Sequence, residues 1–451
     1  MKTYQFKKHI FLGSVCLGML LASMNTFGAN WLTLQGTEPA GAEQLAKVWG
    51  FVQVQYQDDK SDPNPAGGYI PPKLIAPDWD SQSAFNVNRA RIGVRGVAMP
   101  LDQKINYFLL LEMGNNAITE PGDSFAKATD ASITFNHIKG ARVRAGLFKY
   151  PGAEEGLQAI HVFDYINFTW VTAQMMLERF PNRNYTANIP PQPIPPGQSL
   201  NGYEKGVGAF RDVGIQVFDW FNVGENWEVS YAAMIGNGNG LNFSDNNGSK
   251  DYYLYASGEK VYGGRGPRRQ GLKFFAWYQD GKRSADLTND STYNPEKYDR
   301  ERYGIGAKFL RKGIRVSAEY MWGEGMIWQA PHNPSFGIGP GQGNPNAPGN
   351  GAYAEGKGYY VEGGYRFPGT KWEFDLRYDR YNRLDGDRFE IDFKRTTLGV
   401  QYFFNPRVRA AFNYEFRSAE APNFGPGLGP NGNVDDLGNR IGVQVTAIWS
   451  Q

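Results

Sequence analysis

The stretch FNVNRARIGVRG at residues 85–96 most constrains what this chain can fold into. Side chains of a β-strand alternate between two faces, so small and apolar residues here would share one face. The other face would carry Arg89, Arg91 and Arg95. Three guanidinium groups on one face repel one another, and burying them in a dry core would be costly. The arginine face therefore needs water, whereas the opposite face needs apolar surroundings.

Alternating segments of this kind recur from residue 47 to the end of the chain. Each is close to the roughly 9–11 residues that a tilted strand needs to cross a membrane. The sixteen segments are 51–57, 90–96, 104–112, 130–136, 141–148, 212–218, 227–235, 251–256, 271–278, 302–310, 314–322, 359–367, 371–379, 395–404, 408–416 and 440–449. They predict an all-β fold, a transmembrane antiparallel β-barrel of about sixteen strands.

The connections between these segments alternate in length, which supports the same fold. Barrels of the outer-membrane type have short periplasmic turns and long external loops. The short connections are 99–102, 137–140, 222–226, 311–313, 368–370 and 405–407, with much longer stretches between them. Residues 257–270 are long where a short turn is expected, so a count of eighteen strands also fits.

The N-terminal residues predict export. Residues 1–28 contain three lysines, an apolar run over 10–22 and then small residues, which is the pattern of a signal peptide. The apolar run is shorter than the roughly 20 residues of a spanning helix, which argues against an uncleaved anchor. Residues 29–46 are then a short periplasmic segment, and 47–451 form the barrel.

Composition excludes several function classes for the mature chain. The single cysteine, Cys16, lies in the signal peptide, so no disulfide, cysteine-bound zinc or covalent haem motif is expected. Removal of the signal changes the formal net charge from +2 to −1, because the signal carries three lysines and no acidic residue. This bulk charge gives no sign of nucleic-acid binding. No cofactor or metal is expected.

The longest connection, 149–205, is a candidate for a constriction loop. It begins with helical stretches rich in aromatic residues and ends with the proline-rich run IPPQPIPPGQ. Its apolar content suggests packing against another part of the protein. We expect it to fold into the barrel lumen, and the alternative is a lid or a subunit contact at the surface.

The last segment, 440–449, decides which face points inward. An arginine at the middle of the lipid-facing wall costs about 2–4 kcal/mol, so the apolar set must face lipid and Arg440 must face the lumen. The same alternation predicts a lumen wall with sixteen basic and ten acidic residues. The basic ones are Arg89, Arg91, Arg95, Lys104, Arg142, Arg144, Lys273, Arg302, Lys308, Arg315, Arg366, Arg377, Arg395, Arg409, Arg417 and Arg440. The acidic ones are Glu112, Asp130, Asp212, Glu228, Glu319, Glu362, Glu373, Asp375, Asp379 and Glu415.

These charges predict an ion preference. Lysine and arginine rings in a pore lower the electrostatic barrier for anions. The segment 371–379 carries mainly carboxylates on its inner face, so opposed walls of unlike sign and a transverse field are also expected.

Several stretches resemble the phosphate-selective porin O/P family of Gram-negative outer membranes. They are NRARIGVRG (88–96), VRAGLFKYP (143–151), MLERF (176–180), RDVGIQV (211–217) and DNNGSKDYYLYA (245–256). The resemblance implies a sixteen-stranded trimeric barrel in the outer membrane, with a basic pore for small anions. On that basis the candidate pore-lining, anion-binding residues are Arg89, Arg91, Arg95, Arg142, Arg144 and Lys149, the last just after the fifth strand.

Three other functions are possible for such a sequence. A general porin of weak selectivity would use the same arginines only to shape its wall. A barrel that sheathes an electron-transfer cytochrome would need a separate haem protein in its lumen. An enzyme would need a placed nucleophile, but no GxSxG elbow accompanies the histidines after the signal, so we expect no catalysis.

Overall fold

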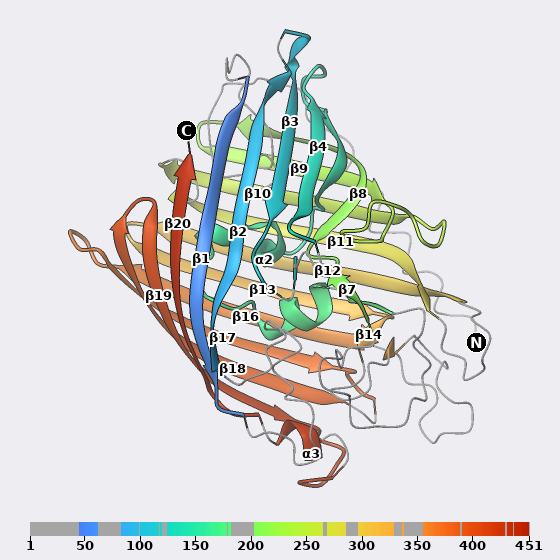
Figure 1. The fold of residues 1–451 in the computed structure, drawn as a ribbon, viewed down its shortest axis with the longest axis vertical. Helices are drawn as coiled ribbons and strands as arrows, with labels where there is room; N and C mark the ends of the chain where they lie inside the picture. Colours follow the sequence, from blue (N-terminus) through green and yellow to red (C-terminus); the bar gives the residue numbers. More distant parts are fainter. Residues whose placement is uncertain are drawn as a thin grey trace.

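Sixteen antiparallel strands close into one barrel in the computed structural model (Figure 1). They pair in chain order, and β1 pairs with β20 to close the ring. The prediction of sixteen strands is confirmed, and the alternative of eighteen is wrong. The barrel strands are β1 (Lys47–Asp59), β2 (Ser83–Ala98), β3 (Asp102–Glu112), β4 (Lys127–Phe135), β5 (Arg142–Lys149), β8 (Arg211–Val223), β9 (Trp227–Gly236), β10 (Asp251–Gly263), β11 (Gln270–Ala285), β12 (Glu296–Arg311), β13 (Ile314–Glu324), β16 (Glu355–Arg366), β17 (Trp372–Arg383), β18 (Ile391–Asn405), β19 (Val408–Glu420) and β20 (Arg440–Ser450).

The other elements are short. None of the helices in the described residues is long and apolar enough to cross a membrane. They are the helices α2 (Glu154–Leu157) and α3 (Asn431–Val434), the 3₁₀ turn η2 (Ile160–Val162), the π-helical turn η3 (Thr172–Met176), and the strand pairs β6 (Arg179–Pro181) with β7 (Tyr203–Val207) and β14 (Ile327–Trp328) with β15 (Phe336–Gly337).

The structure describes residues 45–61, 83–98, 100–116, 118–119, 124–177, 179–181, 203–264, 268–285, 296–328, 336–337, 355–387, 390–428, 431–435 and 437–450. The predicted signal peptide, 1–28, and nearly all of the predicted periplasmic segment, 29–46, lie outside these ranges and stay predictions.

Tight turns join the strands at the end of the barrel where β20 finishes. Between β12 and β13 the turn is only Lys312 and Gly313, with φ of 49° and 85°. Two consecutive residues with positive φ match the twist of the flanking strands, which is why a glycine is needed there. The apparently long turn at 257–270 is mostly strand, because β10 runs to Gly263 and β11 begins at Gln270. Charged residues such as Glu259 hide the alternation at this end of β10.

The two faces of the wall differ as the alternation predicts. In β20, Val443 and Val445 are exposed on the outside, while Arg440, Gln444 and Thr446 are buried inside. The inward set could not face lipid at acceptable cost, and the outward set has no polar atoms to offer water.

Aromatic side chains form two belts on the outside of the wall. Near the tight turns, Trp372 packs on Tyr402 with ring centroids 4.7 Å apart. Near the opposite end, Tyr320 packs on Trp322 at 4.3 Å and on Tyr359 at 5.9 Å. Such belts mark the two membrane interfaces of a transmembrane barrel.

Candidate pore and anion site

The chain that leaves β5 turns toward the inner wall of the barrel (Figure 1). The backbone N–H of Ile166 donates to Asn413 of β19 at 2.8 Å, and that of Trp170 donates to Asp379 of β17 at 2.9 Å. Both acceptors are buried, inward-facing side chains. We call residues 150–177 the inner loop. Most of the rest of the predicted loop, 149–205, lies outside the described residues, so its role as a constriction stays a prediction.

The inner loop brings an apolar core into the barrel. Trp170, Val171 and Met176 are at most 1% exposed and pack in one cluster with inward side chains of the wall. Trp170 packs on Phe393 of β18 in a tilted arrangement, with ring centroids 5.2 Å apart. This packing fixes the loop by burial of apolar surface.

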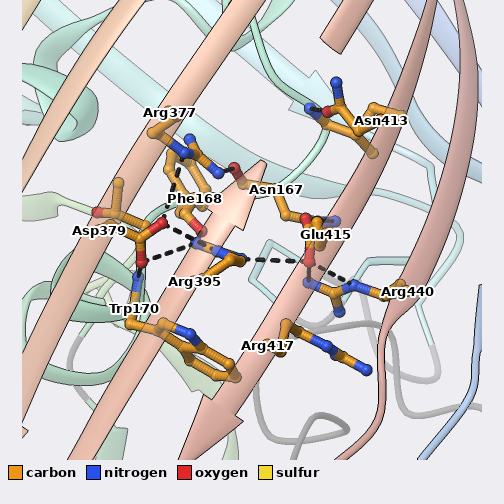
Figure 2. A network of polar contacts seen from close by, with 12 residues as sticks. Asn167, Phe168, Trp170, Arg377, Asp379, Arg395, Asn413, Glu415, Arg417 and Arg440 are labelled. Carbon is orange, nitrogen blue, oxygen red and sulfur yellow. Dashed lines mark hydrogen bonds and ion pairs between the residues drawn. The ribbon is translucent and has the colours of Figure 1, made fainter. Parts of the chain in front are cut away.

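Arginines of the wall also hold the inner loop by its backbone carbonyl oxygens (Figure 2). Arg377 of β17 donates to the carbonyl of Asn167 at 2.9 Å, and Arg395 of β18 donates to that of Phe168. Hydrogen bonds from charged donors contribute about 1.5–3 kcal/mol each. These arginines therefore act as anchors, and their charge is directed at the loop.

Carboxylates neutralise the same arginines (Figure 2). Arg395 lies 2.9 Å from Asp379 and 3.4 Å from Glu415, and Arg440 lies 2.8 Å from Glu415. All of these side chains are at most 4% exposed. A buried pair of this kind is stable only when its remaining donors and acceptors are satisfied, which the loop backbone does here.

Asp164 ties a second part of the inner loop to the wall. Its carboxylate lies 3.2 Å from Arg315 of β13 and 3.1 Å from Arg268 in the turn between β10 and β11. Burial alone would raise the pKa of Asp164, but the guanidinium groups of Arg315, Arg268 and Arg409 hold it below its ordinary value. Asp164 therefore stays ionised, and the loop stays attached, well into acid.

Sixteen basic and ten acidic wall residues were expected to give the pore a net positive charge. Many of these side chains form ion pairs with one another, so the difference in number does not give the charge that a passing solute meets. The expected transverse field is not supported either. Each carboxylate expected on the inner face of β17 lies in an ion pair: Glu373 with Arg268, Asp375 with Arg315 and Asp379 with Arg395. Alternation gives the face of a side chain but not its partner.

A cavity of about 420 Å³ remains between the inner loop and the wall formed by β1 to β5, β8 and β20. Its lining contains apolar side chains, five basic side chains and one carboxylate. The charged lining residues therefore carry a formal excess of four positive charges. These residues are Lys47, Arg91, Arg95, Lys149, Arg211 and Asp130.

Four of the basic residues form like-charged pairs across neighbouring strands. Lys47 of β1 lies directly opposite Arg95 of β2, and Lys149 of β5 lies directly opposite Arg211 of β8. Like charges in directly opposed positions destabilise a sheet. These pairs therefore concentrate positive charge on one part of the wall.

Arg91 and Arg211 have carboxylate partners among the described residues. Arg91 lies 2.6 Å from Glu112, and Arg211 lies 3.0 Å from Asp130. These pairs fix the positions of both guanidinium groups at the cavity wall. Lys149 donates to the carbonyl of Gln158 at 2.7 Å and so also ties the inner loop to β5.

The structure brings three of the six candidate residues together, since Arg91, Arg95 and Lys149 line the cavity. Arg89 faces the lumen but lies outside the cavity lining, where it donates to Gln53 at 3.1 Å. Lys149 is the last residue of β5 and does not follow the strand.

The other two candidates do not line the cavity. The guanidinium carbon of Arg142 lies 3.8 Å from the ring centroid of Trp220, and that of Arg144 lies 4.5 Å from the ring centroid of Phe218. Both arginines belong to the end of β5 near the tight turns, where they pack on aromatic side chains of β8. Their candidacy comes from the family resemblance, and a role in anion binding stays a prediction for both.

Sequence reasoning missed Lys47 and Arg211. Strict alternation from Asp212 would turn Arg211 outward, but the preceding Ala209 and Phe210 have φ of 52° and 61°. Positive φ is rare for such residues and leaves no mark in the sequence. Gly146, with φ of 124°, interrupts the alternation of β5 in a similar way before Lys149. Lys47 could have been found by extending the first segment to its true start.

His161 of the inner loop faces the same cavity. Its ring lies 4.9 Å from Phe51, measured between centroids. Burial, together with the positive charges of Arg409, Arg91 and Lys149, lowers the pKa of His161 to about 3. The imidazole is therefore neutral at physiological pH and belongs to the aromatic part of the lining.

We expect the difference in unfolding free energy between His161→Phe and wild type to favour the variant by about 2 kcal/mol more at pH 5 than at pH 7.5. An unfolded histidine protonates near pH 6.5, whereas His161 does so only near 3. Between these values the unfolded state binds more protons, so wild type loses stability as pH falls, and the variant lacks this loss. Urea unfolding of both proteins at the two pH values measures it. Equal pH dependence would mean that His161 protonates normally.

The described residues contain no group of three or more His, Cys, Asp or Glu side chains that could hold a metal ion.

Residues 228–420 match the family described as "Phosphate-selective porin O and P". The family resemblance is confirmed. The matched part runs from β9 to β19 and contains one of the resembling motifs, 245–256. The arginines of β2 and β5 lie outside it. The matching family and the sixteen-stranded barrel point to an outer-membrane porin channel.

Solved structures give the same fold. OmpF of Salmonella typhi in complex with daunomycin has a TM-score of 0.53 at 13% identity, covering 90% of this chain and 97% of that one. A loop-deletion mutant of OmpT from Vibrio cholerae has 0.51 at 10%, and the anion-selective porin from Comamonas acidovorans has 0.50 at 16%; each covers 90% of this chain and 99% of the other. No curated protein matches the sequence.

Proposed function

We propose that this outer-membrane porin prefers small anions and that these anions pass the basic cavity beside the inner loop. The observation that carries the proposal is the presence of two like-charged pairs at opposed strand positions, Lys47 with Arg95 and Lys149 with Arg211. Both pairs border one cavity in which, among the described residues, Asp130 is the single acidic lining residue. The positive electrostatic potential of these side chains lowers the energy barrier for anions and raises it for cations.

The family name and the anion-selective porin among the similar structures support this preference. The inner loop is attached to the inner wall and occupies part of the lumen, which weighs against a sheath around an electron-transfer cytochrome. Small anionic solutes, outer-membrane lipid and a homotrimeric assembly are the proposed partners, with export by the predicted signal peptide.

The test is the reversal potential in a planar bilayer under a KCl gradient, for wild type and for Lys47→Glu with Arg95→Glu. This double variant changes the formal excess in the cavity from four positive charges to none. We expect the chloride-to-potassium permeability ratio to fall by about tenfold or more, since one charge at about 4 Å contributes about 1 kcal/mol in water. Arg91 is unsuitable because its loss would leave Glu112 buried and unpaired.

The matched control is Lys139→Glu with Lys312→Glu. It changes the total charge equally, but both lysines are exposed in tight turns and neither lines the cavity. We expect it to keep the wild-type potential. If the cavity variant also kept it, or if wild type showed no anion preference, the protein would be a general porin and the arginines would only shape its wall.

A further inference from the structure

The cavity beside the inner loop has an aromatic side that a purely electrostatic function does not use. Trp49 and Phe51 of β1 and Phe108 of β3 line it, with Leu110, Leu157 and Ile160 beside them. The three rings form one cluster, because Trp49 lies 6.4 Å from Phe51 and 6.0 Å from Phe108, measured between centroids. The neutral ring of His161 continues this surface, 5.8 Å from Trp49.

Cationic side chains lie directly beside these rings. The guanidinium carbon of Arg91 lies 5.7 Å from the ring centroid of Phe51, and that of Arg95 lies 5.9 Å from that of Phe108. A solute at this point therefore meets a positive group and an aromatic face at the same time. This combination is a recognition pattern for an amphiphilic anion.

Inorganic phosphate does not suit such a surface. Its charge and hydrogen-bond acceptors point in all directions, whereas the aromatic side offers as donors only the indole N–H of Trp49 and an N–H of the His161 ring. Moving a charged group against apolar walls without compensating hydrogen bonds is costly. A planar aromatic carboxylate has its charge at one end only, so its carboxylate can meet Arg95 and Lys47 while its ring packs on Trp49 and Phe108.

We propose that the cavity binds small aromatic monocarboxylates, with benzoate as the simplest example. The inference rests on the proposed function, since it assumes that anions pass through this cavity. The volume of about 420 Å³ falls in the range of small-molecule sites and leaves room for water beside one such ion. Binding is transient, as a channel requires, because solutes must leave as well as enter.

The experiment measures block of the chloride current in planar bilayers by added benzoate, phosphate or benzamide. Aromatic contacts contribute about 0.5–1.5 kcal/mol each, so two of them predict half-block by benzoate at about tenfold lower concentration than by phosphate. Benzamide has the same ring but no charge, and it should not block. A phosphate half-block equal to or below that of benzoate would overturn the inference, as would block by benzamide equal to that by benzoate.

The variant Trp49→Leu with Phe108→Leu removes two rings and keeps apolar side chains in their places. We expect it to lose the benzoate advantage while its reversal potential in KCl stays at the wild-type value. An unchanged benzoate block would contradict the aromatic site. The reversal potential of wild type tests the anion pore separately, so failure of the proposed function and failure of this inference give different results.

Discussion

Arg395→Met should detach the inner loop from the barrel wall and destabilise the protein by about 3–5 kcal/mol. Arg395 donates to the carbonyl of Phe168 in the loop and lies 2.9 Å from Asp379 and 3.4 Å from Glu415. Methionine fills similar space without charge, so both carboxylates lose a partner while they remain buried. Removing one partner of a buried pair is costly because the other charge stays behind.

The released loop should also change the channel. Trp170 is held by Asp379 through its backbone N–H, and Asp379 is itself held by Arg395. We expect a larger and noisier single-channel conductance in planar bilayers. Cleavage by a glutamate-specific protease after Glu154 or Glu155 should also become detectable, since both residues are at most 3% exposed in the intact protein.

Arg380→Met is the matched control. Arg380 lies on β17 and makes two hydrogen bonds to Asp392 at 2.7 and 2.9 Å, but its side chain is 42% exposed. An exposed pair contributes only about 0–1 kcal/mol, so stability, conductance and protease resistance should stay close to wild type. If Arg395→Met behaved like this control, the packing of Trp170 and its neighbours, and not the ion network, would hold the loop.

The barrel could be predicted from the sequence because membrane geometry imposes a strict local rule. Each strand must alternate, and turn length must alternate with it, so the sixteen strands and the inward face of Arg440 follow from neighbouring residues alone. The one ambiguous turn arises where Glu259 of β10 pairs with Arg269, which directly precedes β11, so that the end of a strand looks like a polar loop.

The charge of the pore could not be predicted in the same way, because it depends on contacts between distant residues. Arg377 and Arg395 look like free pore cations in the sequence, yet their partners are carbonyl oxygens of Asn167 and Phe168, more than 200 residues away. The arginines of β2 were placed on the correct face. The cavity also needs Lys149 and Arg211, whose orientation depends on backbone turns that alternation does not record.

Val445→Arg should cost about 2–4 kcal/mol of folding free energy, because it places a guanidinium on the lipid face near mid-strand. Val445 is 42% exposed and lies opposite Val54 of β1 and Ala410 of β19, so no partner of opposite charge is adjacent. The measurement is urea unfolding in lipid vesicles, followed by the mobility shift between folded and unfolded forms on a gel.

Ile441→Arg, on the same face of β20, is the control that distinguishes the effect of depth in the membrane from the effect of an added charge. Ile441 lies opposite Asp58, which forms an ion pair with the exposed Lys60, so this end of the strand is at the water interface. An arginine at the interface costs only about 0–1 kcal/mol, and Asp58 would offset part of it. Equal losses for both variants would mean that the outer face of β20 does not meet the hydrocarbon core, and that a subunit contact covers it instead.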